Sequence, residues 1–406
     1  MVPNGWEVKS LDSVSKVIDC KHRTPKYVKE GVPLVSPGTI KWGALDLITP
    51  TKRVSTEEYS SLMDHCTVNV GDLVLSRNQS VGVASFVESE EPFVLGQDTV
   101  LVKPTEADSR FLFYNLQSVE TQRTIFKLAG GSTFSRINLG DIRKLKGIYP
   151  PLPEQRKIAK ILSTWDKAIS TTERLIDNSK QQKKALMQQL LTGKKRLLDD
   201  SGKPFKGEWE EVKVGSLITK HSEKTNRSGQ YPVLTSSRKG IMFQSDYYND
   251  RDVASEDNTG YNVVPRGFFT YRHMSDDLVF KFNINTICDK GIVSTLYPVF
   301  AAKENKVVPY FLQLLLNEGN EFKRFSLAQK QGGSRTYMYL SKLNDLKIYI
   351  PNINEQQKIT SVLTNADKEI ELLEQQLAGL KQEKKALMQQ LLTGKRRVKV
   401  DDEAVA

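Results

Sequence analysis

The stretch Lys183–Lys194, KKALMQQLLTGK, decides the organisation of this chain of 406 residues, because the same twelve letters return at Lys384–Lys395. The offset of 201 residues also maps Glu154–Gln155 onto Glu355–Gln356, so the similarity reaches well upstream of the identical letters. The chain is therefore an internal duplication, and each repeat ends in one copy of a long segment.

Each copy of the long segment carries an apolar stripe with the spacing of a coiled coil. Its positions alternate between steps of three and four residues, which is typical of a helix with one apolar seam. Pro151 and Pro351 precede the two segments, and Gly193 and Gly394 end them, as expected for helix starts and stops. About 39 residues at 1.5 Å each make a helix of roughly 58 Å. The stripes are Leu162, Trp165, Ile169, Thr172, Ile176, Ser179, Lys183, Leu186 and Leu190, and Leu363, Ala366, Ile370, Leu373, Leu377, Leu380, Lys384, Leu387 and Leu391.

A helix with one apolar seam needs a partner, and the charges indicate which one. Residues 154–192 include eight basic and four acidic side chains, whereas 355–393 include five and six. In a parallel pair Lys183 would meet Lys384 in the seam, while an antiparallel pair sets Lys183 near Asp367 and its acidic neighbours. Exposed ion pairs contribute at most about 1 kcal/mol each, so the prediction rests on avoiding like charges in the seam. We expect an antiparallel coiled coil; the alternative is two helices that each pack on their own globular domain.

Composition limits the classes of protein. The length allows two to three domains, and 59 Lys+Arg against 48 Asp+Glu give a net charge of +11. This charge favours a polyanionic partner but also suits an ordinary basic protein. Cys20, Cys66 and Cys288 have no CxxC spacing and no metal-ligand pattern with the four histidines, so we expect reduced cysteines in a cytoplasmic protein without a bound metal. No secretion signal and no run approaching 18 apolar residues is present, so neither secretion nor a membrane span is expected.

The globular part of the first repeat has the pattern of a mixed α and β fold. Short apolar or alternating runs bounded by Gly, Pro and Asn predict strands, and spaced apolar residues over Arg110–Leu128 predict a helix. A Gly-rich loop at 130–133 follows, before Pro150-Pro151 and the long helix. The predicted strands are Val32–Ser36, Leu73–Ser76, Val81–Val87 and Thr99–Val102.

The second repeat follows the same plan with drifted residues. Pro33–Ser36 is echoed by Pro232–Thr235, and Leu73–Arg77 by Phe268–Arg272. The sequence thus predicts an α+β fold: two similar mixed α/β globular domains, joined by two long antiparallel helices that form a coiled coil, with a pseudo-twofold internal repeat. The predicted boundaries are 1–150 for the first domain, 151–194 for the first helix, 195–350 for a linker and the second domain, 351–396 for the second helix and 397–406 for a tail.

The chain shows no convincing catalytic motif. A methyltransferase would need a Gly-rich cofactor turn and an Asn/Asp-Pro-Pro-Tyr/Phe loop, but the only Pro-Pro is Pro150-Pro151, preceded by Tyr149. No GxxxxGK[ST] phosphate loop is present. Carboxylate-x-Lys fragments of a metal nuclease occur at 304–306 and 321–323, without a Pro-Asp partner upstream. We expect no catalytic residue, metal or cofactor in this chain.

Short polar loops that mix Arg, Lys, Gln, Asn and Ser with aromatic residues are the candidate binding surfaces. Arg, Asn and Gln make bidentate contacts to guanine or adenine edges, and Lys with Ser or Thr holds phosphates. An ordinary solvated turn is the alternative for each loop. Arg77 and Arg272 end strands that occupy matching positions in the two repeats. For these two residues the alternative is a salt bridge to the scaffold. The candidates are Lys21, Arg23, Lys41, Arg77, Asn78, Gln79 and Arg136 in the first domain, and Arg238, Lys239, Arg272, His273 and Arg335 in the second.

Several of these motifs together resemble the DNA-specificity (S) subunit of bacterial type I restriction-modification systems, over essentially the whole chain. The resemblance rests on the Pro-x-Pro-Glu-Gln-x-Lys-Ile motif at Pro151–Ile158, its weaker copy at Asn352–Ile359, the repeated ALMQQLLTG and the two divergent domains. Asp19–Pro25, DCKHRTP, also resembles a segment common in the family's target recognition domains, and the second domain lacks it.

The resemblance implies two target recognition domains that each read one half of a split, asymmetric double-stranded DNA sequence, with helices that set the gap. It also implies that two modification (methyltransferase) subunits dock on the repeats and that translocating restriction subunits join them. S-adenosylmethionine, ATP and Mg²⁺ would then belong to the partners, and this chain would be non-catalytic. The candidate partner contacts are Leu186, Met187, Leu190, Leu387, Met388 and Leu391.

Two other classes stay open at this point. A non-catalytic scaffolding protein would use the rod for assembly and bind DNA without sequence preference. A single-chain nuclease would cleave DNA with magnesium alone.

Overall fold

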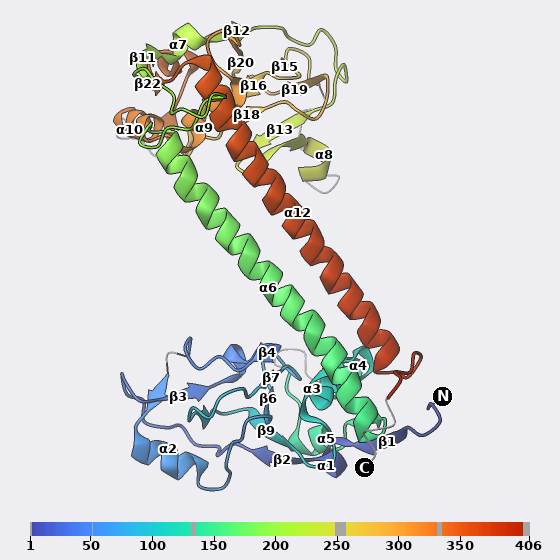
Figure 1. Cartoon of the computed structure of the whole chain (residues 1–406). Helices are drawn as coiled ribbons and strands as arrows, with labels where there is room; N and C mark the ends of the chain where they lie inside the picture. The colour runs from blue at the N-terminus through green and yellow to red at the C-terminus, as the bar shows by residue number, and fades with distance from the viewer. Residues whose placement is uncertain (1, 51, 131–134, 248–256, 331–334, 401–406) are drawn as a thin grey trace. The chain divides into compact units, whose positions relative to one another are not determined.

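The computed structural model describes residues 2–50, 52–130, 135–247, 257–330 and 335–400. The chain divides into two compact units: Met1–Arg174 with Glu374–Ala406, and Leu175–Leu373. Each unit therefore combines one globular domain with the start of one long helix and the end of the other, as the colours of Figure 1 show.

The two long segments are helical, as predicted. They form α6 (Leu152–Leu190) and α12 (Ile353–Leu391), each of 39 residues. Every position of the two predicted stripes is buried or half-buried. Both helices are closed by a glycine with left-handed backbone, Gly193 at φ 66° and Gly394 at φ 68°, a conformation that side chains with a Cβ rarely adopt.

The contacts between α6 and α12 run antiparallel within each unit. In the first unit Lys384, near the end of α12, pairs with Asp166, near the start of α6, at 2.5 Å. In the second unit Lys183, near the end of α6, pairs with Asp367, near the start of α12. The predicted antiparallel coiled coil is confirmed. Each lysine that would have met its like in a parallel seam contacts a carboxylate instead.

A buried glutamate ties the start of each helix to the end of the other. Glu355 is fully buried and accepts two hydrogen bonds from the Arg196 guanidinium, both at 2.6 Å. Its counterpart Glu154 accepts two bonds from Arg397, both at 2.7 Å, and one from the indole N–H of Trp6 at 3.1 Å. A buried charge is tolerated when it is paired and hydrogen-bonded. This network gives the repeated glutamate a structural role.

The globular part of the first unit is built on a five-stranded sheet of order β2-β9-β6-β7-β4. β6 (Leu73–Ser76) lies at its centre and is buried along its whole length. A second sheet has the order β5-β3-β8, and β1 (Glu7–Ser10) pairs with β10 (Lys146–Tyr149), which leads into α6. The other strands are β2 (Ser15–Asp19), β3 (Val32–Val35), β4 (Gly43–Ala44), β5 (Arg53–Val54), β7 (Ala84–Phe86), β8 (Val94–Leu95) and β9 (Thr99–Pro104).

One predicted helix of the first unit is in fact two. The structure breaks Arg110–Leu128 at Ser118, whose backbone is extended and whose hydroxyl accepts a hydrogen bond from the N–H of Thr121. The single-helix prediction was wrong because a serine with this geometry caps a new helix. The helices of the first globular part are α1 (Leu11–Val14), the 3-10 helix η1 (Pro37–Thr39), α2 (Thr56–Met63), α3 (Ser109–Gln117), α4 (Val119–Leu128) and α5 (Leu139–Arg143).

The second unit repeats this plan. Its sheet has the order β12-β20-β16-β18, which corresponds to β2-β9-β6-β7, and β11 pairs with β22 ahead of α12. Three further strand pairs are β13 with β14, β15 with β19 and β17 with β21. The strands are β11 (Glu210–Lys213), β12 (Ile218–His221), β13 (Leu234–Ser237), β14 (Gly240–Phe243), β15 (Asn262–Pro265), β16 (Phe269–Thr270), β17 (Met274–Ser275), β18 (Asn283–Ile284), β19 (Lys290–Val293), β20 (Val299–Ala302), β21 (Thr336–Tyr337) and β22 (Lys347–Ile350). The helices are α7 (Val214–Leu217), α8 (Gln244–Tyr247), α9 (Pro309–Glu318), α10 (Asn320–Ala328) and α11 (Leu340–Leu343).

The repeated helix ends belong to the apolar cores of the units. Leu391 and Leu392, at the end of α12, lie in one apolar cluster with Ile158 of α6 and the first globular part. Leu190 and Leu191 do the same in the second unit. Packing on a globular domain therefore accounts for part of the identity between the two copies.

Candidate nucleic-acid interface

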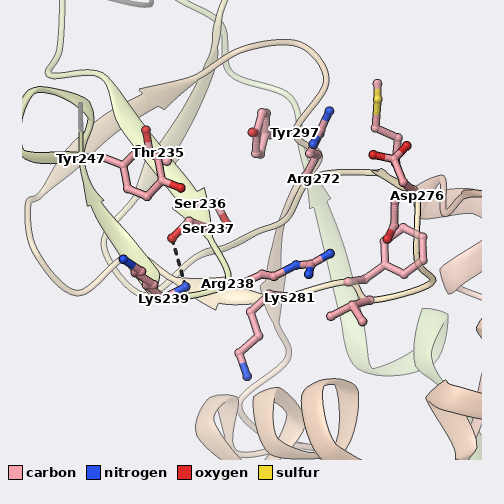
Figure 2. Close-up of a pocket in the computed structure, with 14 residues that line it drawn as sticks. Thr235, Ser236, Ser237, Arg238, Lys239, Tyr247, Arg272, Asp276, Lys281 and Tyr297 are labelled. Atoms are coloured by element: carbon pink, nitrogen blue, oxygen red, sulfur yellow. Dashed lines mark hydrogen bonds between the residues drawn. The ribbon is translucent and has the colours of Figure 1, made fainter. Parts of the chain in front are cut away.

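A polar cavity opens on the second unit between the β13–β14 hairpin and the segment that follows β16 (Figure 2). Its volume is about 470 Å³, and four basic residues line it together with two tyrosines. Three sequence candidates, Arg238, Lys239 and Arg272, lie here together. The full lining is Thr235, Ser236, Ser237, Arg238, Lys239, Tyr247, Arg272, Met274, Ser275, Asp276, Val279, Phe280, Lys281 and Tyr297.

The two arginines of the cavity differ in their partners. Arg238 pairs with Asp277 at 2.6 Å, and this contact is the largest cause that lowers the pKa of that carboxyl group. Arg272 is exposed and forms no hydrogen bond or ion pair with any residue that the structure describes. Lys281 also lines the cavity and pairs with Glu318 at 3.2 Å. Arg272 is thus the arginine of this cavity that no described acid neutralises.

His273 and Arg335, the other candidates of the second domain, lie in different settings. His273 is buried, its Nδ1 contacts the carbonyl oxygen of Leu296, and its ring stacks on Tyr339 with centroids 5.1 Å apart. Arg335 is half-exposed and pairs with Asp276 at 3.0 Å. The preceding part of that loop, 331–334, lies outside the described residues.

Arg77, the first-domain candidate that the sequence analysis matched with Arg272, is buried. Only 5% of its surface is exposed. Its Nη1 donates to both carboxylate oxygens of Asp19, at 2.9 and 3.0 Å, and its Nε donates to the carbonyl oxygen of Ile137 at 3.2 Å. This geometry favours the salt bridge to the scaffold that the sequence left open for Arg77.

Arg77 and Arg272 are not equivalent in the structure. The prediction that they occupy matching positions in the two repeats was therefore wrong. The equivalent of Arg77 is His273, because the carbonyl oxygen of each accepts the N–H of a matched residue, Ile137 or Met338. Arg272 corresponds to the residue before Arg77. Side chains alternate along a strand, so a slip of one residue moves a side chain to the other face. The slip explains why one arginine is buried and the other exposed.

The DCKHRTP segment is tied to α2 by its basic residues. The Lys21 ammonium lies 2.6 Å from both Asp64 and the carbonyl oxygen of Ser61, and Arg23 pairs with Glu58 at 2.5 Å. These contacts hold the pKa of the Asp64 and Glu58 carboxyl groups below their usual range. Lys21 and Arg23 remain partly exposed, and their charges are already paired.

The remaining first-domain candidates are more accessible. Lys41 and Gln79 are exposed, and Gln79 has a positive φ of 58°. Asn78 is half-buried, and its amide approaches Asp98 at 3.5 Å. Arg136 is half-exposed and pairs with Asp98 at 2.7 Å. The structure thus gathers Asn78 and Arg136 around one carboxylate, whereas residues 131–134 of the preceding loop lie outside the described residues.

Sequence reasoning missed residues that line two hollows. Gln79 also lines a cavity of about 660 Å³ along α4, next to Phe126, whose side chain is 84% exposed. The signal was present, because a phenylalanine on the polar side of an amphipathic helix is unusual. Tyr247, Lys281 and Tyr297 of the second-unit cavity carried no comparable signal, since they come from separate segments.

Asp19, Cys20 and His22 form a group that the sequence analysis did not expect, with ligand atoms within 4.8 Å of one another. His22 directs Nε2 at Asp19, 3.0 Å away, and Nδ1 at the Cys20 sulfur, 4.0 Å away. Burial raises the pKa of the Cys20 thiol. Because Arg77 already occupies both oxygens of Asp19, a cation here would have to displace a guanidinium.

The candidate partner contacts on the helices have mixed exposure. Leu190 and Leu391 are buried in the cores of their units, whereas Leu186, Met187, Leu387 and Met388 are half-buried. Four positions between the leucines of the repeat are exposed in both copies: Lys184, Ala185, Gln188 and Gln189, and Lys385, Ala386, Gln389 and Gln390. Among the described residues, no helix is long and apolar enough to cross a membrane.

The comparisons with known proteins agree on one protein family. The family model described as type I restriction modification DNA specificity domain matches residues 3–179 and, a second time, residues 206–382. The MjaX and MjaVIII type I restriction enzyme specificity subunits of Methanocaldococcus jannaschii are similar along their length. The first is 27% identical over 432 residues, 98% of this chain and 95% of that protein. The second is 25% identical over 427 residues, 98% and 94% respectively.

A solved structure shares the fold. The S subunit of a type I restriction-modification system from M. genitalium superposes with a TM-score of 0.57 at 15% identity, covering 96% of this chain and 97% of that chain. The repeated match and the shared fold agree with the internal duplication read from the sequence.

Proposed function

Because the chain belongs to the type I restriction modification DNA specificity domain family, we propose that it directs such a complex to a bipartite, asymmetric DNA site. Each globular domain reads one half of the site. The observation that carries this proposal is that the two units share strand order and the buried glutamate network but differ in their polar surfaces. One scaffold with two surfaces suits the reading of two different half-sites.

The paired helices have two roles in this proposal. They set the distance between the half-sites, and their exposed repeat letters bind two modification subunits. Packing on the globular domains accounts for the identity of the buried leucines but not of the exposed Gln188–Gln189 and Gln389–Gln390. Two identical exposed surfaces suit two copies of one partner.

Chemistry belongs to the partners in this proposal. The sequence has no methyltransferase loop and no phosphate loop. S-adenosylmethionine would serve the modification subunits, and ATP with Mg²⁺ would serve the restriction subunits. The chain itself would be a non-catalytic, DNA-binding member of a cytoplasmic complex.

The test is a map of methylated positions in DNA from cells that express this chain with its modification subunit. We expect one split, asymmetric motif. Replacing the first globular part, residues 5–149, by that of another family member should change one half of the motif and leave the other intact. Methylation without a sequence preference would favour the scaffolding alternative, and a change in both halves would contradict reading by separate domains.

A further inference from the structure

We infer that Arg272 reads a guanine in the half-site of the second domain, through the cavity that it lines. The inference rests on the proposed function and adds to it the residue and the base. Among the arginine candidates of both domains, Arg23, Arg77, Arg136, Arg238 and Arg335 each contact a carboxylate within the described residues. Arg272 contacts none there and is exposed in the cavity.

The backbone of Arg272 is held firmly by its two neighbours. Tyr271 is fully buried, its hydroxyl donates to the carbonyl oxygen of Met338 at 2.8 Å, and its ring lies 4.5 Å from that of Phe282. His273 is buried on the other side. The side chains of both neighbours are buried whereas that of Arg272 is exposed, so the backbone at Arg272 is anchored on both sides. The guanidinium is therefore attached to a well-anchored stretch of backbone, which lowers the conformational entropy lost when Arg272 binds.

The chemistry of this side chain favours guanine. A guanidinium presents two parallel N–H donors, which match O6 and N7 on the major-groove edge of guanine. Adenine presents a donor in the place of O6, so the same fork meets a like group. Lys239 and Lys281 lie on other sides of the same cavity (Figure 2) and suit the phosphates that flank a base. Arg238, already paired with Asp277, suits a phosphate or the rim.

The experiment compares methylation maps of the complete complex with its modification subunit, for the parent and three variants. Arg272→Ala should reduce discrimination at one G·C position of the second half-site by about 10- to 100-fold. Arg272→Lys should show the same loss although the charge is kept, because an ammonium lacks the fork. Arg266→Ala is the matched control, since Arg266 is an exposed arginine that pairs with Asp289 outside the cavity; its motif should equal that of the parent.

Four outcomes would overturn the inference. Retention of the full motif by Arg272→Lys would show that only charge matters and that Arg272 holds a phosphate. A change confined to the first half-site, or no change in Arg272→Ala, would exclude the residue from readout of the second half-site. If the parent complex itself gives no bipartite motif, the proposed function fails together with this inference. A parent motif that Arg272→Ala leaves intact rejects the inference alone.

Discussion

Arg77 holds its place through three hydrogen bonds that leave almost none of its guanidinium exposed. The bonds join the residue after β6, the end of β2 and Ile137, which lies beyond the Gly-rich loop, so one side chain connects three segments. Asp19 in turn contacts His22 of the DCKHRTP segment. Arg77 therefore orders a segment that the first domain exposes, without itself reaching the surface.

The first prediction contrasts Arg77 with Arg272. Arg77→Ala removes the guanidinium from a mostly buried pair and leaves the Ile137 carbonyl without its side-chain donor, so it should destabilise the first unit by about 2–4 kcal/mol. Arg272→Ala removes an exposed side chain and should change stability by at most about 0.5 kcal/mol. Thermal unfolding measures both effects, together with amide hydrogen exchange at Leu73–Ser76 for Arg77→Ala and at Phe269–Thr270 for Arg272→Ala. Equal effects of the two substitutions would contradict the assigned burial.

The register at these residues marks a limit of sequence reading. The letters around Leu73–Arg77 and Phe268–Arg272 align with arginine under arginine, and the repeat offset cannot reveal a one-residue slip in short strands. Only the register of β6 against β9, and of β16 against β20, shows that Arg77 and His273 occupy equivalent positions in the two units. Burial of a charged side chain depends on this register, and so it could not be predicted from residue type.

At the scale of elements, the long helices follow closely from sequence. Stripe, prolines and glycines predicted their existence, and the lysine positions predicted their antiparallel contact, because like charges in a seam are unfavourable. The break at Ser118 was missed, since apolar spacing continues across it and only the cap geometry distinguishes two helices from one. The sequence showed that Glu154 and Glu355 occupy matching positions in the two repeats. It did not predict their arginine partners, because these contacts depend on the fold.

The second prediction concerns these buried glutamates. Arg196→Ala leaves Glu355 buried without its arginine partner, which should cost about 3–5 kcal/mol, and should open the first turns of α12 to solvent exchange. Arg397→Ala should cost less, because Glu154 keeps the hydrogen bond from Trp6, whereas in the described part of the second unit the indole nitrogen of Trp209 has no partner. Amide hydrogen exchange over 353–360 and 152–159 compares the two. A larger increase in exchange over 152–159 than over 353–360 would show that the hydrogen bond from Trp6 does not stabilise Glu154 after the arginine is lost.

The third prediction tests the exposed repeat letters. Ala185→Glu introduces a charge on the exposed side of α6 and should release one modification subunit, while Ala386→Glu should release the other; the double variant should bind neither. Ala185→Ser and Ala386→Ser serve as matched controls, because they change the same positions without a charge. Native mass spectrometry of the purified complex counts the bound subunits. Two subunits retained by the double variant would place the partner contact elsewhere.

At the scale of the whole chain, the duplication separates what the two repeats share from what they do not. Strand order, the helix pair and the glutamate network recur, and the sequence predicted the helix pair because it depends on periodic apolar letters. The cavity of the second unit could not be predicted, because its lining comes from the hairpin, from α8 and from residues near 272–281 and 297. A surface assembled from separate segments depends on the fold that brings them together.

The last prediction treats the helix pair as a ruler, which follows from the proposed function. Four residues inserted into α6 after Arg174 and four into α12 after Leu373 lengthen each helix by about 6 Å. DNA advances about 34–36 Å per turn of ten base pairs, so the two half-sites should move apart by roughly one to two base pairs. Each domain must still face its groove, and this requirement selects among the allowed spacers. The bases within each half-site should stay the same, because the insertions lie outside both globular parts.

The control is an insertion of four residues after Asp200, in the exposed linker between α6 and β11, which should leave the spacer unchanged. Methylation maps of the parent, the helix variant and the linker variant give the spacer directly. A longer spacer with the parental half-sites in the helix variant alone supports the ruler. An unchanged spacer in an active helix variant, or a spacer that also changes with the linker, would show that the distance between half-sites is set by something other than the paired helices.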